Sequence, residues 1–394
     1  MTKRVLLAAV GNVNHVSTWS GTPFHLLQVA KTTGVIHQGL SLEPIDSGRG
    51  LRRYLWNLAA VARGRGHGGY QFSAPCIEHY WAPCRGNLAG ARVINCFQLF
   101  PPSVVANKTV ELGFYIDQTL LQLFNAYGLG TGISKWMARD AMQRERAGYI
   151  RAPVIVTHSH WAAQSVVHDY GIAAEKVQVV VPGANLDIAA YNDWCNGRNA
   201  VSHRTPSPLR LVFVGKDAQR KGLDRLIKAV RLARAGGADC QLRIIGCTPE
   251  RLEPELRDVD GVEWLGFIDK QHKPRAYIDS VANNDVGCLL SHAEAGGMCL
   301  REFHALGLAV IGPDVGGSPD HVITEAAHLV RPEASDESIA ALITRLSVDR
   351  VEVQRMREIS WARRDEVSWT TAVSRLAEFF SGPCGASPQP ASAA

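Results

Sequence analysis

The sequence has no hydrophobic run long enough to cross a membrane. The longest apolar run near its start, Val5–Val10, follows Lys3 and Arg4 and has six residues. A membrane-spanning helix needs about 20 apolar residues, and the apolar part of a secretory signal needs at least about seven. We therefore interpret Val5–Val10 as a first strand and expect a cytoplasmic protein.

Regularly spaced cysteines are also lacking. The nine cysteines are an odd number and are scattered without any Cys-x2-Cys pair, which argues against a disulfide framework and fits a reducing compartment. The group Cys76, His79 and Cys84 has a spacing that common zinc sites do not use. We predict no metal site and no bound cofactor.

The glycine signature of dinucleotide binding is missing after the first strand. That strand is followed by Gly11-Asn-Val-Asn-His15 instead of a Gly-x-Gly-x-x-Gly turn, which disfavours a nicotinamide-dependent enzyme. Acidic residues are scarce in the first half: residues 1–200 carry 18 Lys and Arg against 11 Asp and Glu, and the rest carries 24 against 26. A basic first half suggests an anionic acceptor or a membrane surface and not nucleic acid.

Strand-like and helix-like segments alternate along the 394 residues, of which 46% are hydrophobic and 20% charged. This length and pattern predict an α/β protein of two domains, each with a parallel sheet, that face a central cleft. We predict a first domain over residues 1–190, a polar linker over 188–208, a second domain over 209–367 and a disordered tail over 381–394. Strands are expected near residues 4–10, 92–96, 153–157, 209–214, 241–246, 262–265, 285–290 and 308–312.

The first chemically informative segment contains two carboxylates, Glu294 and Glu302, and the pair Gly296-Gly297. An apolar run typical of a buried strand precedes it, and Met298–Leu306 has helical spacing. A glycine turn from strand to helix offers free backbone N–H groups to an anion such as phosphate. Two carboxylates beside an anion suit neutral hydroxyl partners, which a ribose and a sugar supply. The segment therefore predicts a nucleotide-sugar as ligand.

A second segment lies roughly seventy residues upstream, where an apolar strand ends at Gly215 and a helix begins near Gly222. The loop between them carries the cations Lys216, Arg220 and Lys221. The carboxyl ends of parallel strands lie along one edge of a sheet, so we expect these cations near Glu294. The helix after them has one apolar stripe, formed by Leu223, Leu226, Ile227 and Val230.

Together these motifs resemble glycosyltransferase family 4, the retaining group with the GT-B fold. The resemblance rests on Gly215-Lys-x4-Lys-Gly222, on Ser291-x2-Glu-x-Gly-Gly-x4-Glu302 and on Gly307-Leu-Ala-Val-Ile-Gly-Pro-Asp-Val-Gly-Gly-Ser-Pro-Asp320. In the first half, Trp19-Ser-Gly-Thr22 resembles a branch of that family with a Trp-Ser-Gly-Thr loop, and Tyr115-Ile-Asp-Gln-Thr119 resembles its Asp-x-Thr segment. The chain departs from the family at Lys216, where Arg is usual, and at Ala295-Gly296-Gly297, where Gly-Phe-Gly is usual.

The resemblance implies metal-independent transfer of a sugar, with retained anomeric configuration, from a UDP- or GDP-sugar to a hydroxyl acceptor. It implies that Glu302 binds the ribose, that Glu294 binds the transferred sugar, and that Lys216 and Lys221 stabilise the departing diphosphate. Asp117 is expected to contact the sugar or the acceptor. A helix over residues 368–380 is expected to return to the first domain. The residues expected to bind the donor are Gly21, Thr22, Gly215, Arg220, Gly296, Gly297, Met298, Cys299 and Glu302.

Other interpretations stay open at this stage. Thr22 would cap a helix that starts at Pro23, Asp117 would cap the helix after it, and Glu302 would be an acid in a first helical turn. A GT-B epimerase would share the donor site, and a non-catalytic sugar-binding protein would keep the fold without turnover. The acceptor is a glycan, a lipid-linked or a small-molecule hydroxyl, with weak peripheral membrane contact as a further expectation.

Overall fold

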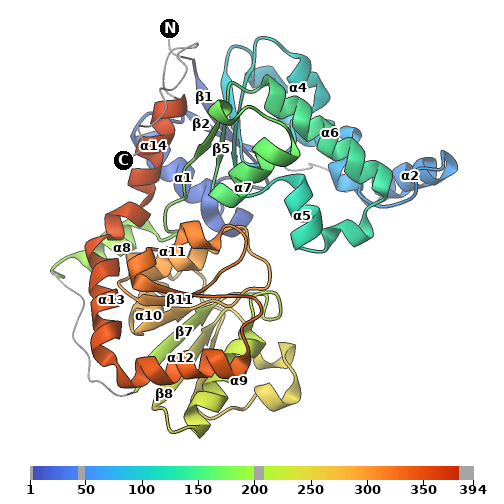
Figure 1. The fold of residues 1–394 in the computed structure, drawn as a ribbon. Helices are drawn as coiled ribbons and strands as arrows, with labels where there is room; N and C mark the ends of the chain where they lie inside the picture. The colour runs from blue at the N-terminus through green and yellow to red at the C-terminus, as the bar shows by residue number, and fades with distance from the viewer. Residues whose placement is uncertain (1–2, 43–48, 199–207, 381–394) are drawn as a thin grey trace. The chain divides into compact units, whose positions relative to one another are not determined.

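The computed structural model describes residues 3–42, 49–198 and 208–380 (Figure 1). The chain divides into two compact units, of which the first comprises Met1–Val181 and the chain from Ala372 onward, and the second Pro182–Thr371. The chain enters the second unit at Pro182, earlier than the boundary near residue 190 that the sequence suggested. The predicted tail 381–394 and the linker residues 199–207 lie outside the described residues.

The first unit is built on a six-stranded parallel sheet with the strand order β2-β1-β3-β4-β5-β6. Its strands are β1 (Val5–Val10), β2 (Gln38–Leu42), β3 (Arg92–Asn95), β4 (Glu111–Ile116), β5 (Val154–Thr157) and β6 (Val177–Val179). Its helices are α1 (Thr22–Thr32), α2 (Arg49–Ala62), α3 (Ala74–Trp81), α4 (Pro102–Ala106), α5 (Leu120–Ala126), α6 (Lys135–Arg151) and α7 (His160–Gln164).

The second unit has its own six-stranded parallel sheet, with the order β12-β11-β10-β7-β8-β9. Its strands are β7 (Leu209–Val214), β8 (Cys240–Ile245), β9 (Val262–Gly266), β10 (Val286–Cys288), β11 (Ala309–Pro313) and β12 (Ala327–Val330). Its helices are α8 (Ile188–Cys195), α9 (Leu223–Ala235), α10 (Pro274–Ala282), α11 (Met298–Ala305), α12 (Asp336–Val348) and α13 (Arg350–Ala362). The prediction of two parallel α/β sheets is confirmed.

The segment expected as a polar linker begins with a helix. Residues 188–195 form α8, and the side chain of Asp187 caps it by accepting a hydrogen bond from Ala190 N at 2.9 Å. Trp194 of this helix is buried and meets Trp361 with ring centroids 5.7 Å apart. The first eight residues of the predicted linker are therefore a capped helix with an exposed face.

The last helix, α14 (Trp369–Phe380), contributes to both units. At its start, Trp369 Nε1 donates a hydrogen bond to Asn185 Oδ1 at 2.9 Å in the second unit. From Ala372 onward it belongs to the first unit, where Arg375 donates to Val179 O at 3.1 Å. Phe380 at its end is buried and its carbonyl accepts from Arg92. The helix therefore has its first residues in the second unit and the rest in the first.

Candidate functional site

Each sheet has one place where the chain reverses the direction in which it adds strands. In the second unit this is the boundary between β7 and β10, because β8 and β9 lie on one side and β11 and β12 on the other. Ligands of open parallel sheets bind beyond the carboxyl ends of the strands at such a boundary. The loop after β7 and the turn after β10 are the two segments that sequence analysis singled out.

Glu294 lies in the turn after β10 and is held by three side chains. Its Oε2 is 3.3 Å from Lys221 Nζ and 3.3 Å from Arg220 Nη1, and it accepts a hydrogen bond from Ser291 Oγ at 3.1 Å. Arg220 also donates to Ala293 O at 3.0 Å. The predicted approach of the basic loop to Glu294 is therefore present, and it orients the carboxylate within a cationic surround.

The charges of this cluster stabilise one another. Burial alone would raise the pKa of Glu294, but Lys221 and then Arg220 hold it below its ordinary value. Burial alone would lower the pKa of Lys221, but Glu294 raises it above its ordinary value. Both groups therefore stay charged over a wide range around neutral pH. An ionised carboxylate with two cations carries a net positive charge, which suits an anionic ligand.

Gly215 and Gly222, at the two ends of the basic loop, allow the backbone to pack closely against Lys221 and Leu290. A methyl group on Gly215 would lie 2.5 Å from Lys221 Cδ, so the lysine stem occupies the space that a side chain would take. Gly222 has φ +65°, and a methyl group there would lie 2.1 Å from Leu290 O in the segment that follows β10. Gly222 is the N-cap of α9, as expected from its place before the apolar stripe.

The turn into α11 is equally tight. Gly297 is the N-cap of α11 and has φ +76°, and a methyl group on Gly296 would lie 2.4 Å from the buried ring of His321. The first turn of an α-helix has no intrahelical acceptors for its N–H groups, so those of Met298 and Cys299 are placed for an anion. The side chain of Cys299 is buried. The contact with the sugar donor that was predicted for this residue can therefore come only from its backbone.

Glu302 lies in the second turn of α11 and is 1% exposed. It is therefore not a first-turn acid, and that alternative is wrong. Its two oxygens lie 2.6 and 2.7 Å from Lys270 Nζ, and it also accepts a hydrogen bond from the hydroxyl of Tyr277. Burial and then Glu302 raise the pKa of Tyr277 well above its ordinary value, so the phenol stays protonated and donates.

Sequence analysis missed both partners of Glu302. Lys270 lies in the loop after β9, and Tyr277 is buried on α10. The rule that loops at the carboxyl ends of parallel strands gather at one edge was available for Lys270, since β9 ends at Gly266. No sequence pattern around Tyr277 distinguishes it from an ordinary core residue.

Both carboxylates and their lysine partners act electrostatically on the thiol of Cys299. Burial raises the pKa of its thiol to about 11, Lys221 and Lys270 oppose that rise, and Glu294 and Glu302 add to it. All four charged groups are thus close enough to act on one thiol in the first turn of α11. The structure therefore brings together both carboxylates and two of the predicted cations.

Lys216 is the predicted cation that does not join this cluster. Its side chain is exposed and its Nζ lies 4.7 Å above the ring of Phe267, in the geometry of a cation–π contact. Its position directly after Gly215 still places its backbone in the loop after β7. The three cations of the loop therefore divide into a pair bound to Glu294 and a single residue on the surface.

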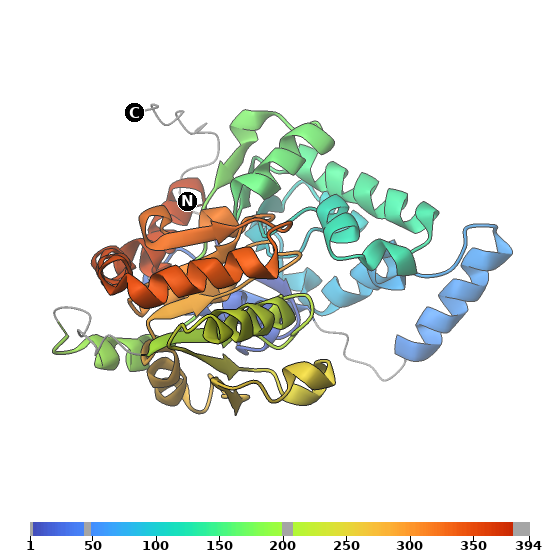
Figure 2. The same cartoon turned by 60° about the horizontal axis from the view of Figure 1, so that its bottom comes forward.

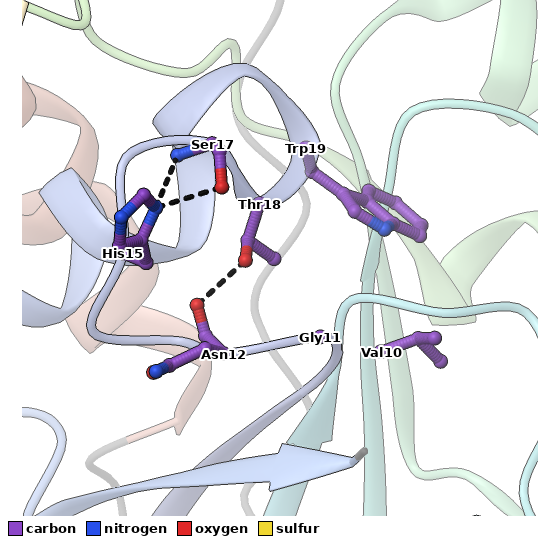
Figure 3. Close-up of a pocket in the computed structure, with 7 residues that line it drawn as sticks. All are labelled: Val10, Gly11, Asn12, His15, Ser17, Thr18 and Trp19. Atoms are coloured by element: carbon purple, nitrogen blue, oxygen red, sulfur yellow. Dashed lines mark hydrogen bonds between the residues drawn. The ribbon is translucent and has the colours of Figure 1, made fainter. Parts of the chain in front are cut away.

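In the first unit, a pocket lies beside the equivalent reversal of the sheet, between β1 and β3. It has a volume of about 560 Å³ and is formed by the loop after β1. Figure 3 shows Thr18 Oγ1 donating to Asn12 O at 2.6 Å and His15 Nδ1 at 2.7 Å from Ser17 Oγ. The residues that line it are Val10, Gly11, Asn12, His15, Ser17, Thr18 and Trp19.

The backbone of this loop is strained. Trp19 and Ser20 have φ values of +48° and +57°, which lie in the left-handed region that residues other than glycine rarely adopt. The ring of Trp19 meets that of Phe97, which follows β3, edge-on at 6.4 Å. Strain of this kind costs about 1–3 kcal/mol per residue and is concentrated at functional sites.

Gly21 and Thr22 differ from the prediction in their roles. Gly21, with φ +90°, is the N-cap of α1, and Thr22 is the first helical residue, so the expected Thr22 cap is wrong. The cause is that the strained turn ends at Gly21, where only glycine tolerates this backbone. A methyl group on Gly21 would lie 3.2 Å from Val16 O. The close backbone contact that Gly21 allows is therefore with its own loop.

Asp117 follows β4 but does not cap α5. The cap is Thr119, whose side chain accepts from Gln122 N while Gln122 Oε1 accepts from Thr119 N at 3.0 Å. The structure thus removes the capping explanation for Asp117. Gly21, Thr22 and Asp117 lie in the first unit, and the other predicted site residues lie in the second.

Residues 3–42, 49–198 and 208–380 contain no candidate metal site and no candidate membrane-spanning helix. Within these ranges no three His, Cys, Asp or Glu side chains gather in a way that could hold a metal ion. In the same ranges no helix combines the length and the apolar character that a membrane crossing requires.

Residues 200–362 match the family model described as "Glycosyl transferases group 1". The chain is 27% identical over 262 residues to the D-inositol 3-phosphate glycosyltransferase of Corynebacterium glutamicum, which covers 62% of this chain and 62% of that relative. The chain therefore spans about three fifths of the length of this curated relative.

Solved structures share the fold over nearly the whole chain. The sucrose-phosphate synthase of Thermosynechococcus elongatus superposes with a TM-score of 0.66 at 15% identity, covering 96% of this chain and 98% of that one. Anabaena Alr3699/HepE in complex with UDP and glucose superposes with a TM-score of 0.63 at 14% identity, covering 96% and 99%. These similarities, with the two parallel sheets, show that the chain has the GT-B fold of glycosyltransferases.

Proposed function

We propose that this protein is a glycosyltransferase that moves a sugar from a UDP- or GDP-sugar to a hydroxyl acceptor, with retained anomeric configuration and without a metal ion. The observation that carries the proposal is the carboxylate of Glu294, oriented by Lys221, Arg220 and Ser291 beside the glycine turn into α11. The match of residues 200–362 to group 1 glycosyl transferases covers this segment and supports the same activity.

Departure of the nucleoside diphosphate is the demanding step of such a reaction, because negative charge develops on the leaving group. We assign the stabilisation of this charge to Lys221, Arg220 and the first N–H groups of α11. Glu294 keeps both cations in place before the donor arrives. Their supply of positive charge supports metal-independent transfer, for which Lys216 provides a further surface cation.

The two carboxylates receive different hydroxyls in this proposal. Glu302 is buried and already bound to Lys270 and Tyr277, so a ribose hydroxyl would join an existing rigid network. Glu294 is assigned to hydroxyls of the transferred sugar. Asp117 in the first unit is assigned a contact with the sugar or the acceptor hydroxyl. The acceptor is a glycan, a lipid-linked or a small-molecule hydroxyl, consistent with a cytoplasmic location at the inner membrane surface.

A thermal-shift titration with UDP, GDP, ADP, CMP and NAD tests the donor site. One nucleoside diphosphate should raise the melting temperature, because binding at a hundredfold excess over Kd stabilises the native state by about 2.7 kcal/mol. The Glu302→Ala variant should lose most of this shift. The Glu263→Ala variant, which removes an exposed glutamate of β9 in the same unit, should keep it.

The outcomes separate the alternatives. If no nucleotide shifts the melting temperature, the chain is a scaffold or sugar-binding protein. If a UDP- or GDP-sugar binds but is converted to another nucleotide-sugar without acceptor, the chain is an epimerase. Release of the nucleoside diphosphate that persists with a chelator and needs an acceptor supports metal-independent transfer, and loss of release with the chelator contradicts that part.

A further inference from the structure

One carboxyl group of the first unit is fully buried and takes no part in the proposed reaction. Glu145 of α6 is 0% exposed. Its two oxygens accept a hydrogen bond from Leu120 N, at the first residue of α5, at 3.0 and 3.2 Å. Figures 1 and 2 show α5 beside α6 within the first unit. Burying a carboxyl group costs free energy that an apolar side chain would not cost, so this group is of interest for what its hydrogen bonds hold in place.

Two tyrosines complete the surroundings of Glu145. The hydroxyl of Tyr149 donates to Glu145 Oε1 at 2.6 Å, and that of Tyr170 donates to Oε2. Tyr170 Oη also accepts a hydrogen bond from Leu121 N at 3.2 Å. Burial and then Glu145 raise the pKa of both phenols, so both stay protonated and donate. The first two N–H groups of α5 are therefore both held by this buried group.

The residues held in this way belong to the segment that begins with Asp117. This Asp117 segment, residues 117–121, follows β4 between the neighbouring strands β3 and β5. Two further side chains hold it: Gln98 Nε2 donates to Gln118 O at 2.9 Å, and Ser165 Oγ lies 2.8 Å from Thr119 Oγ1. Ligands of parallel sheets bind beyond the carboxyl ends of the strands. A segment at that place whose consecutive residues are each fixed by other elements is preorganised for a precise contact.

Glu145 keeps its proton at neutral pH. Burial raises its pKa to about 8 and outweighs the hydrogen bonds from the two tyrosines and Leu120 N, which lower it. The titratable and charged groups around it include Tyr149, Arg146, Tyr170, Lys176, Asp169 and Asp117. An opening of the structure that exposes Glu145 to water returns its pKa toward the ordinary value and releases the proton. Such an opening therefore becomes about tenfold more favourable per pH unit between about pH 4.5 and 8.

We propose that protonated Glu145 is a positioning residue for Asp117, and that loss of its proton releases the Asp117 segment. The inference rests on the proposed function, in which Asp117 contacts the sugar or the acceptor hydroxyl. Sugar transfer is thereby controlled by a group that contacts no substrate. Glutamine reproduces the protonated form, because it has one acceptor oxygen and a donor N–H group, whereas leucine has neither.

Release of UDP from UDP-glucose, or of GDP from GDP-mannose, tests the proposal on the full chain. Glu145→Leu should lower kcat more than about tenfold with the KM of the donor unchanged, because misplacing a reacting group by about 1 Å costs up to about a hundredfold. Glu145→Gln should keep the kcat of the unaltered protein at about pH 7. As the pH rises through about 8, kcat of the unaltered protein should fall and that of Glu145→Gln should not.

The matched control is Glu175→Gln, which changes an exposed glutamate of the same unit and should keep the kcat and the pH profile of the unaltered protein. Identical pH profiles of the unaltered protein and Glu145→Gln overturn the proposal. A loss of kcat at about pH 7 that is as large in Glu145→Gln as in Glu145→Leu also overturns it, because the ionised carboxylate would then be the active form. If Glu145→Leu does not fold, the glutamine variant and the pH profile still decide.

Hydrogen exchange tests the same contact without activity. Between about pH 6 and 7, exchange of the amides of residues 118–122 should accelerate about tenfold more in the unaltered protein than in Glu145→Gln. The thermal shift with UDP or GDP should be equal in both proteins, because the proposed donor site lies in the second unit. If no nucleotide shifts the melting temperature and no donor is turned over, the proposed function fails. Exchange then decides by itself, and an equal acceleration in both proteins overturns the role of Glu145.

Discussion

At the scale of single residues, the Glu294 group shows how the site is prepared before a ligand binds. A carboxylate that is 10% exposed would be costly without compensation, and the structure compensates it with Lys221, Arg220 and Ser291. The same cations serve an incoming diphosphate in the proposed function. The same charged side chains therefore contribute both to stability and to the proposed ligand binding.

The pH dependence of stability follows from this pair. Glu294 has a lowered pKa in the folded state, so its contribution is present above about pH 4.5 and is lost as pH falls through the folded pKa. Lys221 has a raised pKa, so its contribution is present below about pH 10.5 and is lost as pH rises through its folded value. We expect Glu294→Gln to lower the melting temperature by about 4–8 °C, for a loss of about 2 kcal/mol.

The measurement is a series of melting curves for the two proteins. Their difference in melting temperature should be constant between about pH 5.5 and 9.5. It should shrink below about pH 4.5, where Glu294 becomes protonated in the unfolded state, and should vanish as the pH falls through the lowered pKa of the folded state. A difference that persists undiminished at about pH 3 would show that the charge of Glu294 contributes nothing to stability.

Glu294, Glu302, Arg220 and Lys221 could be singled out as candidates from the sequence because each belongs to a short segment whose spacing is readable locally. Lys270 and Tyr277 come from two other segments, and their contact with Glu302 depends on how the sheet places the loop after β9 against α10. The pairing of Lys216 with Phe267 has the same origin. Contacts between distant segments depend on tertiary packing, which local spacing does not encode.

At the scale of elements, the glycines around β7 and α9 show how tightly strand and helix meet. Gly222→Ala should destabilise the protein by more than about 1 kcal/mol, because alanine opposes a φ of +65° and its methyl group would lie 2.1 Å from Leu290 O. Gly237→Ala is the matched control, since Gly237 has φ +91° just beyond the end of α9 and has no atom within 4 Å of the new methyl.

Urea unfolding of the two variants separates backbone strain from collision. Gly237→Ala measures the cost of the left-handed backbone alone, and the excess loss in Gly222→Ala measures the displacement of Leu290, which follows β10. Because Leu290 immediately precedes Ser291, the Gly222 variant should also weaken nucleotide binding. If both substitutions lower the free energy of unfolding equally, the segment after β10 moves away from the new methyl group without a loss of stability.

Elements with a complete local signal were predictable, and three of the four edge strands were not, the exception being β9. The apolar stripe of α9 is fully buried, as its spacing predicted. The strands β2, β6 and β12 lie at sheet edges, are short and are partly exposed, so they lack a continuous apolar run. β4 did carry such a run, Leu112–Ile116, and was omitted although the signal was present.

At the scale of the whole molecule, chain order and unit membership do not coincide. The first unit is completed by residues from the carboxyl-terminal helix, which follow the whole second unit in sequence. The ring of Phe380 is 1% exposed, and a methyl group on Gly113 of β4 would lie 2.8 Å from its Cε1. The first unit therefore reaches full stability only after the last helix has been made.

Phe380→Ala should for this reason destabilise the first unit by about 3–5 kcal/mol, the usual cost of removing a buried phenylalanine. Hydrogen exchange should accelerate in β3 and β4, which contact Phe380 through Arg92 and Gly113, while β7 and β10 of the second unit keep their protection. Phe267→Ala removes a phenylalanine that is 63% exposed and should leave exchange in the first unit unchanged. If exchange instead accelerates equally in both sheets, the two units unfold as one cooperative body and the returning helix stabilises them jointly.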